Sequence, residues 1–236
     1  MTLGHHKRVG DDETSVTLKG KSLSFVTESK LLGVVVDSNL SWCSHINYIV
    51  SKVSPKIGLL GRLRFSLPSN LLTVVYNSII VPYFDYCDTV WGNCCQKYKN
   101  ILQRLQNRCA RIVSGNFDYT VSPKLIIEEL GWQQLEERRR FHLATLTYKC
   151  LNSAAPQYLA NKFTFCNQIH QRNTRSHKNQ NLYVPRPRTE KFKQSLSFIG
   201  AKTWNMLPTE VRSADSVHVF KNRYKGYISN PYNKCK

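Results

Sequence analysis

The 236-residue sequence predicts a mainly α-helical protein that begins with a small antiparallel β element. Runs of strand length are confined to the first 40 residues. Beyond residue 41, apolar residues recur every three or four positions, which is the period of helices that bury one face. A hydrophobic content of 41% is sufficient for a folded core. We therefore expect a helical bundle after the β element, followed by a basic helical C-terminal region.

The β element is predicted from three short runs. Residues 15–19 and 22–26 alternate in character around a Lys-Gly-Lys turn, and residues 31–36 form an apolar run with β-branched residues at its end. We expect these runs to form a two- or three-stranded antiparallel sheet. The polar residues 37–39 should then form a turn, after which Ser41 is suited to cap a helix.

The helices are predicted from apolar periodicity and from the residues at their ends. The first should span 41–65, with Pro55 kinking or dividing it. Gly131 is suited to end a short helix at 123–130. Further helices are expected at 70–82, 98–114, 132–152, 156–159, 195–206 and 216–227.

Two groups of apolar residues are expected in the core. The second helix should bury one wide face, made of Leu71, Leu72, Val75, Ile79 and Ile80. Four aromatic residues of the two closing helices should pack together, namely Phe198, Trp204, Phe220 and Tyr224.

The formal net charge of +19 is the strongest global signal, with 34 Lys or Arg against 15 Asp or Glu. Folding gains nothing from this self-repulsion, whereas a phosphate backbone or an anionic membrane surface would be attracted to it. No apolar run reaches the roughly 18 residues of a transmembrane helix, and the N-terminus is too polar for a secretory signal. We expect an intracellular protein, cytoplasmic or nuclear, that does not cross a membrane.

Basic residues gather on one predicted helix and in one predicted loop. Arg104, Arg108 and Arg111, with Lys97, are spaced to share one stripe of the helix at 98–114. Residues 169–194 lack periodicity and are expected to form an extended basic arm. The candidate nucleic-acid-binding residues are Arg62, Arg64, Arg104, Arg108, Arg111, Arg172, Arg175, Lys178, Arg186 and Arg188. An ordinary solvated helix surface and a flexible linker that binds polyanions weakly are the open alternatives.

Eight cysteines raise the question of disulfides or zinc. There is no Cys-x-x-Cys pair, and Cys43, Cys109 and Cys150 fall on apolar helical faces, where a thiol acts as a small hydrophobe. Cys150, Cys166, His170 and His177 could meet as a zinc site, but their spacing matches no common zinc finger. We expect reduced thiols and no bound metal.

Four ordered sequence blocks lie between roughly residues 25 and 225. They are Leu32-Gly33-Val34 with Asp37, Trp42 and His45-Ile46; Leu67-Pro68 with Tyr76, Pro82 and Tyr86; Val90-Trp91-Gly92 with Leu102-Gln-Arg-Leu-Gln-Asn-Arg-Cys-Ala-Arg-Ile112; and Gly200, Trp204-Asn205, Leu207-Pro208 and Phe220-Lys221. Together they resemble the region that runs from the end of the palm through the thumb in reverse transcriptases of LINE-type (jockey-like, non-LTR) retrotransposons.

The resemblance implies a parent protein with RNA-directed DNA polymerase activity, RNA or an RNA–DNA duplex as its partner, and Mg²⁺ as its cofactor. It also suggests a domain order: the end of the palm at 1–40, a thumb-like bundle at 41–117, a helical connector at 118–168, the basic arm at 169–194 and a C-terminal helical segment at 195–236.

The sequence contains no Tyr-Ala-Asp-Asp turn, the source of catalytic carboxylates in the resembled family. Gly10-Asp11-Asp12 follows a polar tract and lies too close to the first block, so a solvated turn is the simpler interpretation. Asp37 and His45 should cap and solvate a helix start. We therefore expect a fragment with no catalytic residues and no polymerase activity of its own. A non-catalytic RNA- or DNA-binding module and a relic without selected activity are the alternatives.

Overall fold

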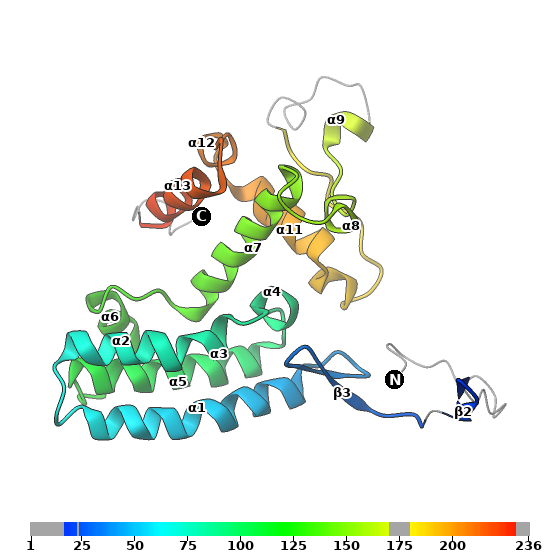
Figure 1. The fold of residues 1–236 in the computed structure, drawn as a ribbon. Coiled ribbons are helices and arrows are strands. Elements are labelled where there is room, and N and C mark those ends of the chain that lie inside the picture. Colours follow the sequence, from blue (N-terminus) through cyan, green and yellow to red (C-terminus); the bar gives the residue numbers. More distant parts are fainter. Residues whose placement is uncertain (1–16, 23, 170–179, 230–236) are drawn as a thin grey trace. The chain divides into compact units, whose positions relative to one another are not determined.

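The computed structural model describes residues 17–22, 24–169 and 180–229 (Figure 1). The fold is mainly α-helical with a small N-terminal β element, as the sequence predicts. The chain divides into two compact units, one formed by Met1–Cys87 with Cys94–Leu135 and the other by Asp88–Asn93 with Glu136–Lys236. We call them the first and the second unit. Within the described ranges, no helix combines the length and the hydrophobicity needed to cross a membrane.

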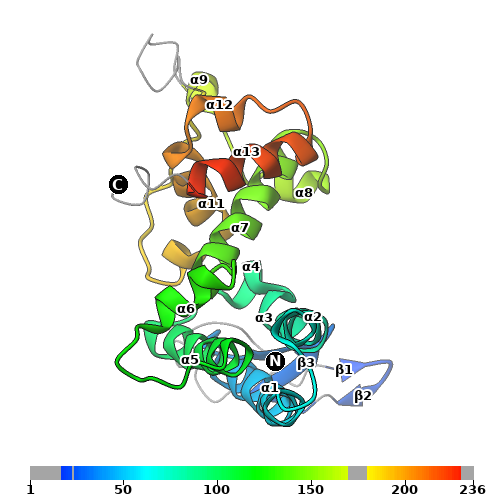
Figure 2. The same ribbon diagram turned by 90° about the vertical axis from the view of Figure 1, so that its left-hand side faces the viewer.

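The first unit is built on three helices that lie side by side, α1 (Cys43–Leu63), α2 (Ser69–Ile79) and α5 (Gln96–Ser114). Figure 2 shows the three nearly end-on. The short helix α3 (Val81–Asp85) continues the direction of α2, and α6 (Pro123–Glu129) packs against α5. The bundle thus buries one face of each long helix.

The core of the first unit follows the helical period. Its fully or nearly fully buried side chains include Ile46, Ile49, Val53, Ile57, Leu60, Leu72, Tyr76, Ile80, Leu102 and Cys109. The expected face of α2 is partly wrong, because Leu71 is 45% exposed while Tyr76 is 2% exposed. Tyr76 stacks on Trp132 with ring centroids 3.8 Å apart, and its hydroxyl accepts a hydrogen bond from Gln106 Nε2. The buried face of α2 is therefore centred on Tyr76, which leaves Leu71 at its exposed side.

The N-terminal β element consists of two separate antiparallel hairpins rather than one sheet. In the first, β1 (Thr17–Leu18) pairs with β2 (Lys21–Ser22), and in the second, β3 (Glu28–Leu31) pairs with β4 (Val34–Asp37). The expectation of a single strand at 31–36 is therefore wrong. The chain turns at Leu32-Gly33, where both residues have positive φ angles of 46° and 85°. Two-residue hairpin turns require such angles, and Gly33 adopts them readily.

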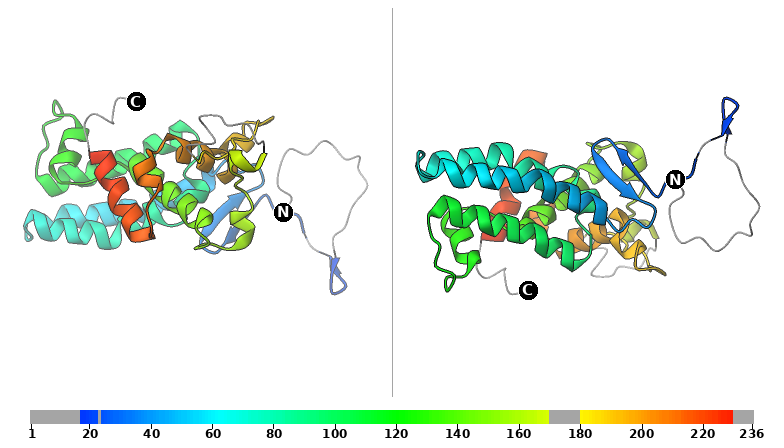
Figure 3. Two further views of the ribbon diagram at one scale, coloured as in Figure 1. Left: turned by 90° about the horizontal axis from the view of Figure 1, so that it is seen from above. Right: turned by 90° about the horizontal axis from the view of Figure 1, so that it is seen from below.

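Gly33 is also held against a side chain from a distant part of the sequence. The Tyr86 hydroxyl donates a hydrogen bond of 2.7 Å to the Leu32 carbonyl oxygen. A Cβ atom on Gly33 would lie 3.3 Å from Tyr86 Cε1. The tyrosine ring thus covers the turn of the second hairpin, which lies near the start of α1 (Figure 3).

We expect Gly33→Ala to destabilise the second hairpin by about 1–2 kcal/mol, because the alanine must adopt a positive φ and press on the Tyr86 ring. The measurement is amide hydrogen exchange of residues 28–37 for this variant and of residues 17–22 for its control. Gly20→Ala is the matched control, since Gly20 also has a positive φ of 76° but no atom lies within 4 Å of the position that an added methyl group would take. Equal effects at the two glycines would show that the Tyr86 contact contributes nothing.

Two side chains, Asp37 and Ser41, hold the start of α1. The Ser41 hydroxyl, which the sequence suggested as the cap, accepts the Cys43 N–H at 3.3 Å. The Asp37 carboxylate accepts hydrogen bonds from the backbone N–H groups of Asn39, Ser41 and Trp42, at 3.1, 3.0 and 2.8 Å. Trp42 precedes the helix with a φ of 65°, which shifts the first helical residue to Cys43. Pro55 does not divide α1, because it lies on the exposed face, where water can satisfy the carbonyl group left without a donor.

The second unit contains three longer helices and several short ones. The longer helices are α7 (Leu135–Leu151), α11 (Leu196–Met206) and α13 (Val217–Ser229). Ser195 caps α11, since its hydroxyl accepts from the Phe198 N–H. The short elements are α4 (Asp88–Trp91), α8 (Gln157–Ala160), α9 (Cys166–Ile169), the 3₁₀ helix η1 (Phe192–Gln194) and α12 (Thr209–Arg212). The sequence predicted only α8 among them, as a short helix that restarts at Pro156; a single turn is too short to show an apolar period.

The core of the second unit is a cluster of aromatic rings. Phe220 lies at its centre, fully buried, with its ring centroid 4.5 Å from that of Tyr148 and 6.4 Å from that of Trp204. Tyr224 packs beside it, which confirms three of the four expected aromatic residues. Phe198 is half-buried and lies outside the cluster.

Candidate nucleic-acid interface

The long helices of the first unit carry positive charge only. Together, α1, α2 and α5 contain eight Lys or Arg side chains and no Asp or Glu. Helix surfaces in soluble proteins usually mix both signs, because oppositely charged neighbours support the helix. These three helices therefore offer no acidic partner to their own cations, and their surface suits a polyanion.

The exposed cations of α5 form one line along the helix. Lys97, Arg104 and Arg108 are all exposed, and their spacing of seven and four residues places them on one side. The opposite side of α5 is anchored by buried Leu102 and Cys109. We call Lys97, Arg104 and Arg108 the α5 basic stripe.

Arg111 does not belong to this stripe, contrary to the sequence-based expectation. It is 7% exposed, and its guanidinium donates hydrogen bonds of 2.7 and 2.8 Å to the carbonyl oxygens of Asp118 and Val121. The same group lies 4.9 Å from the ring centroid of Tyr119. Arg111 therefore holds the segment between α5 and α6. The sequence contained a sign of this burial, since Arg111 is flanked on both sides by apolar residues, Ala110 and Ile112-Val113.

Arg62 and Arg64 lie at the C-terminal end of α1. Arg62 is exposed in the last turn, where the helix dipole favours a cation. Arg64 is half-buried, and its guanidinium carbon lies 4.5 Å from the ring centroids of both Phe65 and Phe117. Both arginines thus belong to the same unit as the α5 basic stripe.

The predicted basic arm is packed against the second unit where the structure describes it. Leu182 is 1% exposed and bridges to Phe165, and the Asn205 side chain both donates to and accepts from the Leu182 backbone at 2.8 Å. Trp204 Nε1 donates to the Gln180 carbonyl. Trp204 and Asn205 therefore hold residues 180–182 against the second unit, so this part of the predicted arm is not free. Apolar periodicity could not reveal this, because two residues of the segment, Leu182 and Val184, supply its apolar contacts with the core cluster and are too few to show a period.

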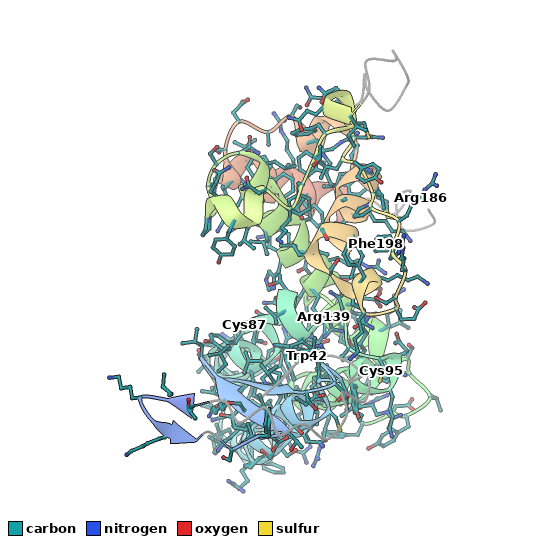
Figure 4. All side chains as sticks on the ribbon, turned by 90° about the vertical axis from the view of Figure 1, so that its right-hand side faces the viewer. Trp42, Cys87, Cys95, Arg139, Arg186 and Phe198 are labelled. Carbon is teal, nitrogen blue, oxygen red and sulfur yellow. The ribbon has the colours of Figure 1, made fainter. Side chains whose placement is uncertain are left out.

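The remaining arm candidates fall into two groups. Arg186 and Arg188 are exposed on the extended segment before η1, and Figure 4 shows Arg186 at the outer edge of the second unit. Arg172, Arg175 and Lys178 lie outside the described residues. Arg186 and Arg188 thus remain available for contact with an anion.

The cysteines in the described ranges are free thiols. Cys109 is fully buried, and burial raises the pKa of its thiol to about 12. Cys150 is also buried, which raises the pKa of its thiol, while Cys166 on α9 is half-buried. The two histidines of the considered zinc group, His170 and His177, lie outside the described residues. The buried thiols thus act as small apolar side chains, as expected.

Asp37 and His45 fix the second hairpin to α1. Partial burial alone would raise the pKa of the Asp37 carboxyl, but the hydrogen bonds from Ser41, Trp42 and Asn39 outweigh it, so the pKa is lowered. His45 is 3% exposed, and its Nδ1 accepts the Val35 N–H at 3.3 Å. Asp37 is therefore a cap, as expected, whereas His45 is buried rather than solvated.

The burial of His45 predicts a pH dependence of stability. Burial lowers the pKa of His45 below its ordinary value of 6.5. The unfolded chain therefore binds a proton that the folded chain does not, and stability falls as the pH drops below about 6.5, by up to about 1.4 kcal/mol per pH unit. Urea unfolding of the wild type and of His45→Asn should show this, because the asparagine does not titrate. The prediction is wrong if the stability difference between the two proteins stays constant from pH 7.5 to 5.

Comparison with known proteins finds relatives of this chain among the proteins of mobile genetic elements. The chain is 33% identical over 92 residues to a probable RNA-directed DNA polymerase from transposon X-element of Drosophila melanogaster. The matched region is 37% of this chain and 10% of that protein. The chain is 30% identical over 135 residues to a retrovirus-related Pol polyprotein from the type-1 retrotransposable element R1 of Bradysia coprophila, covering 53% of this chain and 13% of that protein. This chain is related to LINE-type reverse transcriptases.

A further relative of the same kind is the RNA-directed DNA polymerase from mobile element jockey of Drosophila funebris, 26% identical over 140 residues, which are 56% of this chain and 15% of that protein. The chain thus spans only 10–15% of the length of these reverse transcriptases. No family model and no solved structure matches it.

Several residues of the blocks that resemble LINE-type reverse transcriptases have structural roles. Gly33 and Tyr86, from two different blocks, meet at the hairpin turn. Trp91 is fully buried, and a Cβ atom on Gly92 would lie only 2.3 Å from the Asp88 carbonyl oxygen. Asn205 clamps the extended segment of the second unit. These block residues maintain the fold on which the exposed arginines are displayed.

Proposed function

We propose that this chain is part of an RNA-directed DNA polymerase from a LINE-type retrotransposon, and that its first unit binds the RNA–DNA duplex through the α5 basic stripe. Two findings support the proposal. The relatives are named as RNA-directed DNA polymerases or retrotransposon Pol polyproteins. The stripe displays exposed Arg104 and Arg108 on a set of helices without a single acidic side chain, and this observation carries the proposal.

The chemistry of the contact follows from the residue types. A guanidinium group binds a phosphate through two parallel hydrogen bonds, and a rigid helix holds successive guanidinium groups at fixed intervals. Such contacts position a duplex without reading its bases, so binding is independent of sequence. Arg62 on α1 and the exposed Arg186 and Arg188 of the second unit are additional candidates for phosphate contact.

We also propose that the chain binds the duplex without extending it. Polymerisation requires carboxylates that hold paired Mg²⁺ ions. Asp37, the carboxylate in the first of the resembled blocks, does not fit this task because three backbone N–H groups already occupy it. We expect the Mg²⁺ ligands of the parent polymerase to come from parts other than this chain.

The first test measures the binding of a blunt RNA–DNA duplex by fluorescence anisotropy over a range of salt concentrations. We expect the double variant Arg104→Ala/Arg108→Ala to bind about tenfold more weakly at low salt and to reduce the slope of log affinity against log salt by about two, because two phosphate contacts are lost. Lys19→Ala/Lys21→Ala is the matched control, since it removes two exposed cations from the first hairpin.

The second test asks whether the chain extends a primer on an RNA template in the presence of Mg²⁺. Extension by the purified chain would contradict the proposal that catalysis requires residues from elsewhere. Duplex binding that is insensitive to salt and to the α5 variant would contradict the proposed interface, and it would favour a relic without selected activity.

A further inference from the structure

A cavity of about 330 Å³ opens in the first unit where the end of α1, the start of α2 and the end of α5 come together. Its apolar wall includes Leu72, Ile112 and Val113. Its remaining walls include Arg64, Phe65 and Phe117. The volume is at the lower end of the range for small-molecule sites, roughly 300–1,000 Å³, and is large enough for one flat ring.

The aromatic residues of this cavity are unusually accessible. Phe65 is 79% exposed and Phe117 is 42% exposed. Single exposed apolar side chains are common on protein surfaces, but here two exposed rings flank the same cavity. Aromatic faces of this kind bind nucleic-acid bases by stacking, which requires no particular base sequence.

Arg64 supplies a cation between the two rings. Its guanidinium carbon lies 4.5 Å from both ring centroids, so the group is held in place by cation–π contacts. Within the ranges that the structure describes, this guanidinium makes no hydrogen bond or ion pair. A half-buried guanidinium with five donors available is a binding point for an anionic oxygen.

The charge of the cavity favours a nucleotide over other occupants. No acidic residue lines it, and none occurs in α1, α2 or α5. The site therefore offers an apolar space for a flat ring, aromatic faces for stacking and a cation for a phosphate. A nucleotide has these features in one unit, whereas an acidic peptide would use the cation and leave the exposed rings uncovered.

We propose that this cavity binds one unpaired nucleotide of a nucleic-acid strand, with the base against Phe65 and Phe117 and the phosphate on Arg64. The proposal rests on the proposed binding of nucleic acid by the first unit and adds a second site to it. The α5 basic stripe holds paired nucleic acid by its backbone, and the cavity holds a base that has no partner. The chain should accordingly prefer a duplex with a single-stranded overhang to a blunt duplex.

The experiment compares three probes with the full chain by fluorescence anisotropy: a blunt RNA–DNA duplex, the same duplex with a short overhang, and the same overhang without bases. The abasic overhang has the same charge and lacks only the stacking surface. We expect the wild type to bind the intact overhang about tenfold more tightly than the abasic one, as expected for a stacked base. The double variant Phe65→Ala/Phe117→Ala should lose this difference, and Phe25→Ala, which removes another exposed ring, should keep it.

The outcomes separate this inference from the proposed function. Arg104→Ala/Arg108→Ala tests the stripe and should weaken all three probes by a similar factor, while Arg64→Gln should weaken only the two overhang probes. Equal binding of the intact and abasic overhangs by the wild type would indicate a site for a bare anion and would overturn the nucleotide site, even if the stripe variant still lost affinity. The reverse result, base discrimination without any effect at the stripe, would overturn the proposed interface and leave the nucleotide site standing.

A second measurement does not depend on any variant. The fluorescent base 2-aminopurine loses intensity when it stacks on an aromatic ring, so its emission in the overhang should fall when the wild-type chain binds. Binding without this quenching would overturn the proposal. Retention of base discrimination by the Phe65→Ala/Phe117→Ala variant would also overturn it.

Discussion

Replacement of Arg111 by alanine is expected to lower the free energy of unfolding of the first unit by about 2–4 kcal/mol, because two carbonyl groups lose their donors in a partly buried setting. Those carbonyls belong to Asp118 and Val121. The contact of the guanidinium with the Tyr119 ring is lost as well. Amide hydrogen exchange of residues 94–135 is the appropriate measurement, since it reports on the first unit alone.

Arg108→Ala is the matched control for this prediction, because Arg108 lies one turn earlier on the same helix and is exposed. We expect it to change the stability by less than about 0.5 kcal/mol and to act on duplex binding instead. The two arginines should therefore show opposite patterns, one in stability and the other in affinity. A similar loss of stability in both variants would contradict the inward placement of Arg111.

Replacement of Phe220 by alanine is expected to destabilise the second unit by about 3–5 kcal/mol, since a large ring is removed from a fully buried position. The Phe220 ring contacts those of Tyr148, Trp204 and Tyr224. These neighbours are fixed on helices, so they cannot move far enough to fill the cavity that the substitution leaves. Hydrogen exchange of α7 and α11 should report the effect. Phe192→Ala, at a residue that is 41% exposed in η1, should have little effect.

The sequence predicted the helices well where the apolar period was long. On α1 and α5, residues such as Ile46, Val53, Leu102 and Cys109 repeat often enough to mark one face. The helical period placed Arg111 on the exposed stripe, because it does not include the 115–122 segment that folds over this arginine. The apolar neighbours of Arg111 were the one local sign of its burial. Contacts with residues outside the helix therefore determine that Arg111 is buried while Arg108 is exposed.

The β element shows a similar limit. The apolar run at 31–36 has the composition of one buried strand, but a turn at Leu32-Gly33, covered by Tyr86, divides it between β3 and β4. The cavity beside Arg64 was not predicted either, although Arg64 itself was a candidate. Its two aromatic neighbours come from segments about fifty residues apart in sequence, on either side of α2 and α5, and only the packing of these helices brings them together.

The hydrogen bond from Tyr86 to Leu32 has a consequence for the order of events during synthesis. The two residues are 54 positions apart, and a ribosome adds roughly 5–20 residues per second. The turn of the second hairpin must therefore wait several seconds, uncovered, before the tyrosine that closes it has been made. An isolated two-stranded hairpin is only marginally stable in water. During that interval the edges of this hairpin are exposed to other chains. A chaperone that binds nascent chains could bind the hairpin at this stage.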